Sequence, residues 1–297
     1  MLDAVASMSH YEAHLVPVWD ALPDEVRGAF VRGKPTASDH TALVASFTDH
    51  ARARKAGYRR FVVMEHGAGQ SYSNTSPFYA GGWGRQDAGL FLTPNEHAAA
   101  RWRSAYPRAK VEVVGSPRLD DLPARIPDGR VTVAISFHFE CGVSPEARSA
   151  LRHYRSALPE LARSVDLIGH GHPRADLGPM YAALGIEYVP SFDDVCRRAD
   201  LYVCDNSSTL FEFASTGRPV VVLNAPWYRE SVDHGLRFWD AATVGINVND
   251  PGDLVEGVRV ALDDSFGLFR EEALDTVYAY RTGAAQRAAA AITGWLQ

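Results

Sequence analysis

Short apolar runs of strand length alternate along almost the whole chain with stretches whose apolar residues recur at helical spacing. Such runs are typical of strands buried on both faces, and their alternation with helices indicates parallel sheets covered by helices. The expected strands are Ala4–Ala6, Leu43–Phe47, Phe61–Met64, Gly89–Leu92, Val111–Val114, Val131–Ile135, Val165–Ile168, Glu187–Val189, Leu201–Cys204, Val220–Leu223 and Ile246–Val248. The expected helices include Tyr11–Leu22, Glu96–Tyr106, Pro145–Ala162, Met180–Leu184, Phe192–Ala199 and Leu210–Ser215, with two more within Ser265–Gln297.

The eleven expected strands are more than a single doubly wound sheet usually contains. A segment rich in Pro, Gly and Asp, from Gly115 to Gly129, divides the chain into comparable halves, as a linker between domains does. The sequence therefore predicts an α/β protein with two Rossmann-like doubly wound domains, 1–124 and 125–297. We expect both sheets to direct the carboxyl ends of their strands towards one cleft, because ligands bind at such strand ends.

Composition and charge exclude several classes of protein. The 297-residue chain is 46% hydrophobic and 22% charged, as ordinary globular proteins are. Its net charge of −6 gives no overall attraction to nucleic acid or anionic lipid. The basic clusters within Arg52–Arg60 and Arg101–Lys110 are interpreted as solvated helix faces, with a docking surface for an anionic acceptor or membrane headgroups as the alternative.

Cysteine usage and hydropathy indicate the compartment. Cys141, Cys196 and Cys204 are widely spaced and form no C-x-x-C pair, which argues against a disulfide framework and a structural zinc site. A reducing, cytoplasmic setting fits best. No apolar run approaches about 18 residues, and the N-terminus lacks the basic start and apolar core of a signal peptide. We therefore expect no integral membrane segment.

The stretch from Ala199 to Pro219 predicts a strand, a tight polar turn and a helix. The strand ends at Asp205, itself a candidate donor-binding residue, and Ser207, Ser208 and Thr209 follow at the start of the helix. Side-chain hydroxyls and the free N–H groups of a helix start suit a phosphate, although helix capping is the simpler explanation. Glu212 follows Ser208 by about one turn, where its carboxylate can face a ribose.

Three other loops follow expected strands and carry unusual polar residues. His66, within Glu65–Gly69, is a candidate general base, with a capping turn as the alternative. His172 and Arg174, within His170–Arg174, are candidates to bind a diphosphate by hydrogen bonds. His138, within Ser136–Glu140, lies where an α/β domain places its first ligand loop.

Several other chemistries have weak or no support in the sequence. His10 and His14 share a helix face at a spacing compatible with zinc, but no H-E-x-x-H pattern is present, which favours a surface or acceptor-site role, with His10 the better functional candidate. Gly33-Lys34 is followed by Pro35, so no P-loop is formed, and no G-x-S-x-G elbow occurs. No D-x-D pair is available for a metal-bound sugar nucleotide. We therefore expect a metal-free reaction with no cofactor beyond the donor substrate.

The pattern A-D-L-x-V-x-D-x-S-S-x-x-F-E followed by G-R-P-V-V resembles that of the CDP-glycerol glycerophosphotransferases and related GT-B enzymes of bacterial surface polymers. The resemblance includes His66-Gly67, the run from Gly115 to Asp120, His172-Pro173 and the stretch from His10 to Pro17. It spans roughly residues 8 to 225. These motifs are fairly specific for the superfamily but do not define the substrate.

The resemblance implies a nucleotide donor in the C-terminal domain and an acceptor in the N-terminal domain, with C-terminal helices that pack back towards the N-terminal domain. Ser207, Ser208 and Thr209 would then bind donor phosphate, and Glu212 the ribose. His172 and Arg174 would steady the diphosphate leaving group, and the loop at Val189 would contact the base. His66 would be the catalytic base.

The leading hypothesis is therefore a metal-independent GT-B transferase that moves a glycosyl or polyol-phosphate group from a nucleotide-diphosphate donor to an acceptor hydroxyl. A CDP-glycerol-type glycerophosphotransferase and a UDP-N-acetylglucosamine 2-epimerase-like enzyme are the enzymatic alternatives. A non-catalytic nucleotide-binding module is a third. The acceptor is open among a polysaccharide, a lipid-linked polymer and a modified nucleic acid.

Overall fold

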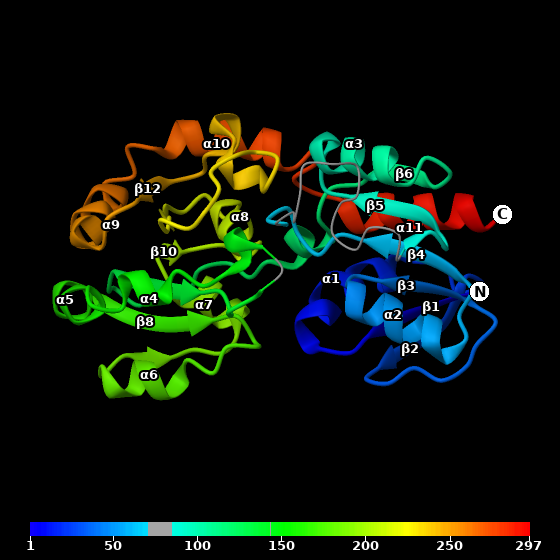
Figure 1. Cartoon of the computed structure of the whole chain (residues 1–297), viewed down its shortest axis with the longest axis horizontal. Coiled ribbons are helices and arrows are strands. Elements are labelled where there is room, and N and C mark those ends of the chain that lie inside the picture. Colours follow the sequence, from blue (N-terminus) through cyan, green and yellow to red (C-terminus); the bar gives the residue numbers. More distant parts are fainter. Residues whose placement is uncertain (71–84, 143) are drawn as a thin grey trace. The chain divides into compact units, whose positions relative to one another are not determined.

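The buried apolar runs form parallel strands in two separate sheets (Figure 1). The computed structural model describes residues 1–70, 85–142 and 144–297, which divide into two units. The first unit contains residues 1–68, 85–121 and 275–297, and the second contains residues 69–70 and 122–274. The chain thus leaves the first unit after Asp121, and its last 23 residues belong to that unit again.

The first unit has the strand order β2-β1-β3-β4-β5-β6, with every neighbouring pair parallel. Its strands are β1 (Leu2–Ala6), β2 (Arg27–Arg32), β3 (Thr41–Val44), β4 (Arg60–Met64), β5 (Ala88–Thr93) and β6 (Lys110–Val113). Its helices are α1 (Ser9–Ala21), α2 (Phe47–Ala56), α3 (Glu96–Ala105), the short η2 (Pro117–Asp121) and α11 (Ala284–Leu296). The order reverses between β1 and β3, which makes their carboxyl ends the topological switch point of this sheet.

Helices cover both faces of the first sheet. On one face, Leu43 and Val62 pack with Leu15 of α1 and Ile292 of α11 in one buried cluster. On the other face, Phe91 stacks on Trp102 of α3 with ring centroids 4.5 Å apart. Because successive strand residues point to opposite faces, strands covered in this way must be apolar on both sides, as the sequence pattern indicated.

The second unit has the strand order β12-β11-β10-β7-β8-β9, again parallel throughout. Its strands are β7 (Thr132–Phe137), β8 (Asp166–Gly171), β9 (Glu187–Tyr188), β10 (Leu201–Cys204), β11 (Val220–Leu223) and β12 (Ile246–Val248). Its α-helices are α4 (Leu151–Tyr154), α5 (Leu158–Ser164), α6 (Gly178–Ala183), α7 (Phe192–Arg198), α8 (Thr209–Ala214), α9 (Leu254–Leu262) and α10 (Gly267–Val277). Helix α10 continues into the first unit. The 3-10 helices of the second unit are η3 (Pro145–Ala147), η4 (Leu236–Phe238), η5 (Asp240–Ala242) and η6 (Pro251–Asp253). Numbered within the unit, this is the doubly wound order 3-2-1-4-5-6, whose switch point lies between β7 and β10.

Alternation along β10 shows how the second core is built. Leu201 and Val203 belong to the buried cluster that includes Val258 of α9. Tyr202 points to the other face, where its ring lies 5.1 Å from Phe213 of α8 and 5.8 Å from Phe192 of α7. Packing against helices on both faces of β10 therefore fixes the position and direction of the strand end that Asp205 follows.

The predicted fold class is confirmed, with three local differences. Strand β2 is missing from the expected set because it is a half-exposed edge strand rather than an apolar run. The strand expected at Leu43–Phe47 stops at Val44, because Ser46 instead caps α2 by accepting a hydrogen bond from the Asp49 N–H at 3.0 Å. The helix expected at Pro145–Ala162 is broken into η3, α4 and α5, and Pro159 lies in the first turn of α5, where proline is tolerated.

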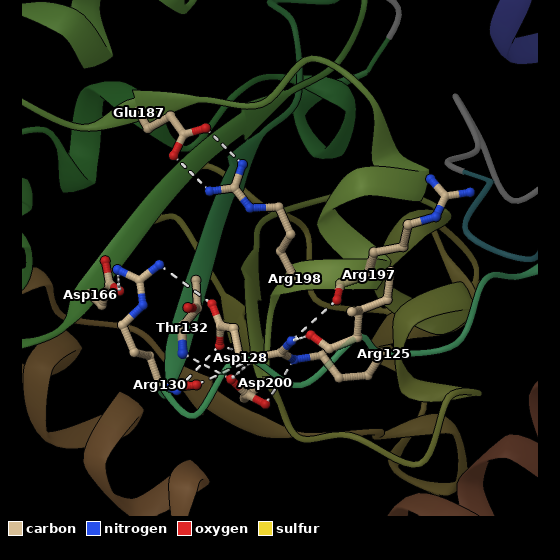
Figure 2. Close-up of polar contacts among 10 residues, drawn as sticks. Arg125, Asp128, Arg130, Thr132, Asp166, Glu187, Arg197, Arg198 and Asp200 are labelled. Carbon is tan, nitrogen blue, oxygen red and sulfur yellow. Dashed lines mark hydrogen bonds and ion pairs between the residues drawn. The ribbon is translucent and has the colours of Figure 1, made fainter.

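Arg125 attaches the start of the second unit to its sheet (Figure 2). Its guanidinium forms a forked pair with Asp200, at 3.0 and 3.1 Å, and also donates to the Arg197 carbonyl at 3.3 Å. Asp200 in turn accepts the Thr132 N–H at 2.9 Å. The Asp200 side chain therefore joins Arg125, at the start of the second unit, to the amino ends of β7 and β10. The forked pair with Asp200 and a hydrogen bond to Asp128 raise the pKa of Arg125 above its usual value.

Arg125→Ala is expected to lower the free energy of unfolding by about 1–2 kcal/mol, because the forked pair is partly shielded from water and its loss leaves Asp200 with fewer donors. Arg197→Ala is a matched control in the same cluster, since Arg197 pairs with the exposed Asp194 within one helix turn. Its effect is expected to stay within about 0.5 kcal/mol. Urea unfolding of both variants measures the difference, and equal effects contradict the anchoring role.

Candidate functional site

Asp205 organises the switch point of the second sheet. It follows β10 directly, is fully buried, and uses both carboxylate oxygens. Oδ1 accepts the backbone N–H of His138 at 2.8 Å and that of Asn206 at 2.7 Å, and Oδ2 accepts that of Ala150 at 2.8 Å. One carboxylate thus holds the loop after β7, the start of α4 and its own turn together. The Asp205 side chain therefore holds these loops in position.

The three hydroxyl residues after Asp205 lie side by side at the start of α8. The Thr209 hydroxyl donates to Ser207 Oγ at 2.9 Å and also lies 2.9 Å from the Tyr202 hydroxyl. The backbone amides of Thr209, Leu210 and Phe211 already donate to Ser207 Oγ, Ser207 O and Ser208 O. The helix start therefore offers a ligand its half-buried hydroxyls, not the unpaired amides that the sequence suggested.

A column of rings lies after β7 and β8. The His172 ring is 4.9 Å from that of His138 and 4.5 Å from that of Phe139, and the Arg174 guanidinium is 5.3 Å from the Phe139 ring. The Arg174 backbone N–H donates to His172 Nδ1 at 3.1 Å, so the neutral His172 ring carries its proton on Nε2. His172 therefore presents an N–H donor, and His138 and Arg174 lie around the same column.

His138 has the opposite tautomer. Its Nδ1 is 2.9 Å from the carbonyl oxygens of both Phe139 and Ala147, and because carbonyls only accept, Nδ1 carries the proton. Its Nε2 is then an acceptor while the ring is neutral. The structure thus brings together a hydrogen-bond donor and a potential acceptor at the carboxyl ends of adjacent strands.

The second imidazole of the His170–Arg174 loop has a structural role. His170 is buried, and its Nδ1 donates to the Val189 carbonyl at 2.8 Å. Burial lowers the pKa of His170 below its usual value, against the effect of that hydrogen bond. Val189 also donates its N–H to the Gly169 carbonyl, and its side chain is buried. Its backbone therefore closes the loop after β8, and its proposed contact with a base stays a prediction.

Glu212 is buried in the second turn of α8, with a relative exposure of 2%. Helical spacing places it one turn beyond Ser208, as the sequence indicated. Its proposed contact with a ribose stays a prediction.

Sequence reasoning missed a guanidinium at this strand edge. Arg237, in η4, donates to the Asp205 carbonyl, to the side chain of Asn224, and to the Leu223 carbonyl at 3.2 Å. It therefore ties together the carboxyl ends of β10 and β11. No motif surrounds it in the sequence, and only the return of the chain after β11 brings it to Asp205.

A second missed group is the ion pair of Glu146 and Arg229. The fully buried Glu146 accepts from Arg229 Nε and Nη2, both at 2.6 Å, and from the Arg229 backbone N–H at 2.8 Å. Burial raises the pKa of Glu146, but the hydrogen bonds from Arg229 more than offset this and leave it below its usual value. The Asn206 side chain also donates to the Glu146 carbonyl. This pair connects the loops on either side of the Asp205 turn.

His66 lies in the first unit, directly after β4 and Glu65. Its Nδ1 donates to the Ala45 carbonyl at 2.7 Å, at the end of β3, which leaves Nε2 as the basic nitrogen of the neutral ring. The Tyr11 ring packs edge-on at 5.1 Å, and the His14 ring lies 6.1 Å away. A carbonyl that fixes the tautomer of a half-buried imidazole is an arrangement suited to a general base.

The two helical histidines differ in their surroundings. His14 is buried, and burial followed by the positive charges of His66, Arg118 and His10 lowers its pKa well below the usual value. A surface role is therefore wrong for His14. His10, one turn earlier in α1, is half-buried and its ring lies 4.0 Å from that of Tyr11. His10, His14 and His66 thus form a group of histidines in the first unit.

The part of the chain that the structure describes has neither a cluster of metal ligands nor a helix able to span a membrane. Within it, no group of three or more His, Cys, Asp or Glu side chains is arranged to hold a metal ion. Among the same residues, every helix is too short or too polar to cross a membrane.

Neither the protein-family models nor the curated proteins contain a match to this chain. Solved structures do match its fold. The wall teichoic acid polymerase TagF, as a variant soaked with CDPG, is 10% identical, with a TM-score of 0.59 over 99% of this chain and 88% of that one. S. aureus MnaA with UDP is 13% identical, with a TM-score of 0.60 over 99% and 95%. UDP-GlcNAc 2-epimerase from Neisseria meningitidis, bound to UDP-GlcNAc, is 13% identical, with a TM-score of 0.56 over 99% of both chains. The likeness shows the fold: two Rossmann-like domains of the GT-B class.

Proposed function

We propose that this chain is a transferase that binds a nucleoside-diphosphate donor in its second unit and moves a glycosyl or polyol-phosphate group onto an acceptor hydroxyl. The observation that carries the proposal is the group of hydroxyls and imidazoles around the switch point between β7 and β10, in a GT-B fold. Open α/β sheets bind ligands at this point. The fold neighbours support a nucleotide-related enzyme, since TagF was soaked with CDPG and MnaA was solved with UDP.

The donor diphosphate is proposed to lie against Ser207, Ser208 and Thr209, with the Nε2–H of His172 and the guanidinium of Arg174 as further donors. Charge-assisted hydrogen bonds of this kind are stronger than neutral ones and grow in importance as the leaving group gains negative charge. Asp205 and Arg237 act indirectly, because their hydrogen bonds hold the loops in place. Glu212 is proposed to bind the ribose.

His66 is proposed to accept the proton of the acceptor hydroxyl on Nε2 as the hydroxyl oxygen attacks the donor. The attacked atom is the anomeric carbon for glycosyl transfer or the phosphorus for polyol-phosphate transfer. His10 is a second candidate for this proton transfer or for contact with the acceptor. The absence of a D-x-D pair in the sequence favours a metal-independent reaction, with the donor as the only nucleotide required.

The leaving nucleotide distinguishes the two transfer reactions. Glycosyl transfer breaks the bond between the sugar carbon and the diphosphate and releases a nucleoside diphosphate. Polyol-phosphate transfer breaks the bond between the attacked phosphorus and the bridging oxygen of the diphosphate and releases a nucleoside monophosphate. Chromatography of the nucleotide product therefore assigns the reaction as soon as any donor is consumed.

A thermal-shift panel of UDP, GDP, CDP, ADP and TDP tests the donor site. A nucleotide present at about 100 times its Kd stabilises the protein by about 2.7 kcal/mol, which gives a clear rise in Tm. The double variant Ser207→Ala/Ser208→Ala is expected to lose this rise, because two of the proposed phosphate donors are gone.

Ser215→Ala/Thr216→Ala is a matched control, since it removes two hydroxyls at the other end of α8 that donate within the helix region. It is expected to keep the nucleotide-dependent rise in Tm. An undiminished rise in the Ser207/Ser208 variant would refute the phosphate assignment.

The 2-epimerase alternative is supported by the UDP-GlcNAc 2-epimerase from Neisseria meningitidis, whose TM-score of 0.56 is close to the 0.59 of TagF. Incubation with UDP-N-acetylglucosamine and no acceptor separates the two activities. A transferase leaves the sugar configuration unchanged under these conditions, whereas an epimerase converts it.

A further inference from the structure

Glu65 is a buried carboxyl group that the proposed reaction does not use. It directly follows β4 and directly precedes His66, and its backbone N–H donates to the Leu92 carbonyl at 3.1 Å. Its relative exposure is only 8%. Burying a carboxyl group is unfavourable unless specific partners hold it, so the partners of Glu65 indicate its role.

The Glu65 carboxyl lies against the aromatic stack of helix α3. The indole N–H of Trp102 donates to Glu65 Oε1 at 2.7 Å. The Trp102 ring packs with Phe91 and Tyr106 in a three-ring cluster, at centroid distances of 4.5 and 5.6 Å. The buried Arg85 guanidinium lies 5.0 Å from the Trp102 ring. A rigid indole therefore holds the carboxyl in a defined place.

Ionisable groups on several elements face this carboxyl. Burial raises the pKa of Glu65 to about 7, while the Trp102 hydrogen bond and the charges of Arg85 and Arg101 act in the opposite direction. Arg101 belongs to α3, Arg85 precedes β5, and His66 is the next residue along the chain. The carboxyl thus changes its charge in the same range as an imidazole does.

Glu65 and His66 are held on opposite faces of the sheet. The Glu65 side chain bonds to Trp102 of α3, whereas the His66 ring packs against Tyr11 of α1 and donates to the Ala45 carbonyl. Any rotation of the backbone between these two residues disturbs both contacts. The position of the imidazole is therefore connected to the Glu65–Trp102 hydrogen bond.

We propose that Glu65 is a positioning residue for His66: its carboxyl, held by Trp102, fixes the turn after β4 and thereby keeps the imidazole on the Ala45 carbonyl. The inference deepens the proposed function and rests on the role of His66 in it.

NMR titration of the His66 imidazole, assigned by its loss in His66→Gln, tests the proposal. Glu65→Ala removes the acceptor of the Trp102 indole and loosens the turn that holds the imidazole on the Ala45 carbonyl, so the His66 midpoint is expected to fall by about 0.5 pH unit or more. Glu65→Gln keeps a carbonyl oxygen for Trp102 and is expected to restore most of the original midpoint. Glu112→Ala is the matched control, because it truncates a half-exposed glutamate of the same unit that pairs with Lys110. It is expected to leave the midpoint unchanged.

A His66 midpoint in Glu65→Ala within about 0.1 pH unit of the unsubstituted protein overturns the proposal. Trp102→Phe is the second variant: it keeps an aromatic ring but removes the indole donor, and it is expected to move the midpoint too. If the midpoint moves but no nucleotide binds, the proposed function fails and the positioning role stands. If nucleotides bind and the midpoint stays, the positioning role alone fails.

Discussion

His66→Gln is expected to lower the rate of donor turnover by about 10²- to 10⁴-fold, the usual contribution of a general base. The reason is the tautomer: with Nδ1–H donating to the Ala45 carbonyl, only Nε2 is available to take a proton, and glutamine has no basic nitrogen to replace it. Initial rates with the donor identified by the nucleotide panel measure the effect.

Nucleotide binding separates loss of a base from loss of structure. His66→Gln is expected to bind the nucleoside diphosphate with an unchanged Kd, because the proposed phosphate donors belong to the second unit. His153→Gln is the control, since this histidine donates to the Asn249 carbonyl away from the proposed site and is expected to keep full turnover. Turnover in His66→Gln equal to that of the control removes His66 as the base.

Asp205→Ala is expected to lower the free energy of unfolding by about 4 kcal/mol, because three backbone N–H groups lose their acceptor and each orphaned buried donor costs about 1–3 kcal/mol. The affected amides are those of His138, Ala150 and Asn206. The loops after β7 and β10 then lose their common support, so nucleotide binding is expected to disappear as well. Urea unfolding and the thermal-shift panel measure the two effects.

Asp263→Ala is the control for Asp205→Ala, because Asp263 is an exposed aspartate whose nearest ion pair spans 3.9 Å. Its effect on unfolding is expected to be within about 0.5 kcal/mol. A small effect of Asp205→Ala, comparable with that of the control, contradicts the role of Asp205 as the organiser of the switch point.

The fold was largely predictable because its signals are local. Buried parallel strands such as Leu201–Cys204 are recognisable as apolar runs, and the turn with Ser207 and Ser208 identifies the helix that follows. The edge strand β2 escaped because it is half-exposed and has no apolar run. The break within Pro145–Ala162 escaped because the Ala150 amide bonds to Asp205, 55 residues away.

The candidate site was predictable only in part, because its side chains are oriented by distant partners. His170 and His172 look equivalent in the sequence, yet His170 still belongs to β8 and is buried against the Val189 carbonyl, whereas His172 lies beyond the strand end in the ring column. Asp205 was a candidate because it follows β10, but the sequence did not reveal that the distant His138 and Ala150 amides bond to its carboxylate. Arg237 carries no motif at all, so only the folded chain reveals its bonds to the ends of β10 and β11.

A crystal structure of the protein with the nucleoside diphosphate selected by the thermal-shift panel tests the central claim most directly. The account predicts diphosphate oxygens within hydrogen-bond distance of the hydroxyls of Ser207 and Ser208 and of His172 Nε2. A nucleotide bound elsewhere, with these side chains making no contact to its phosphates, would contradict it.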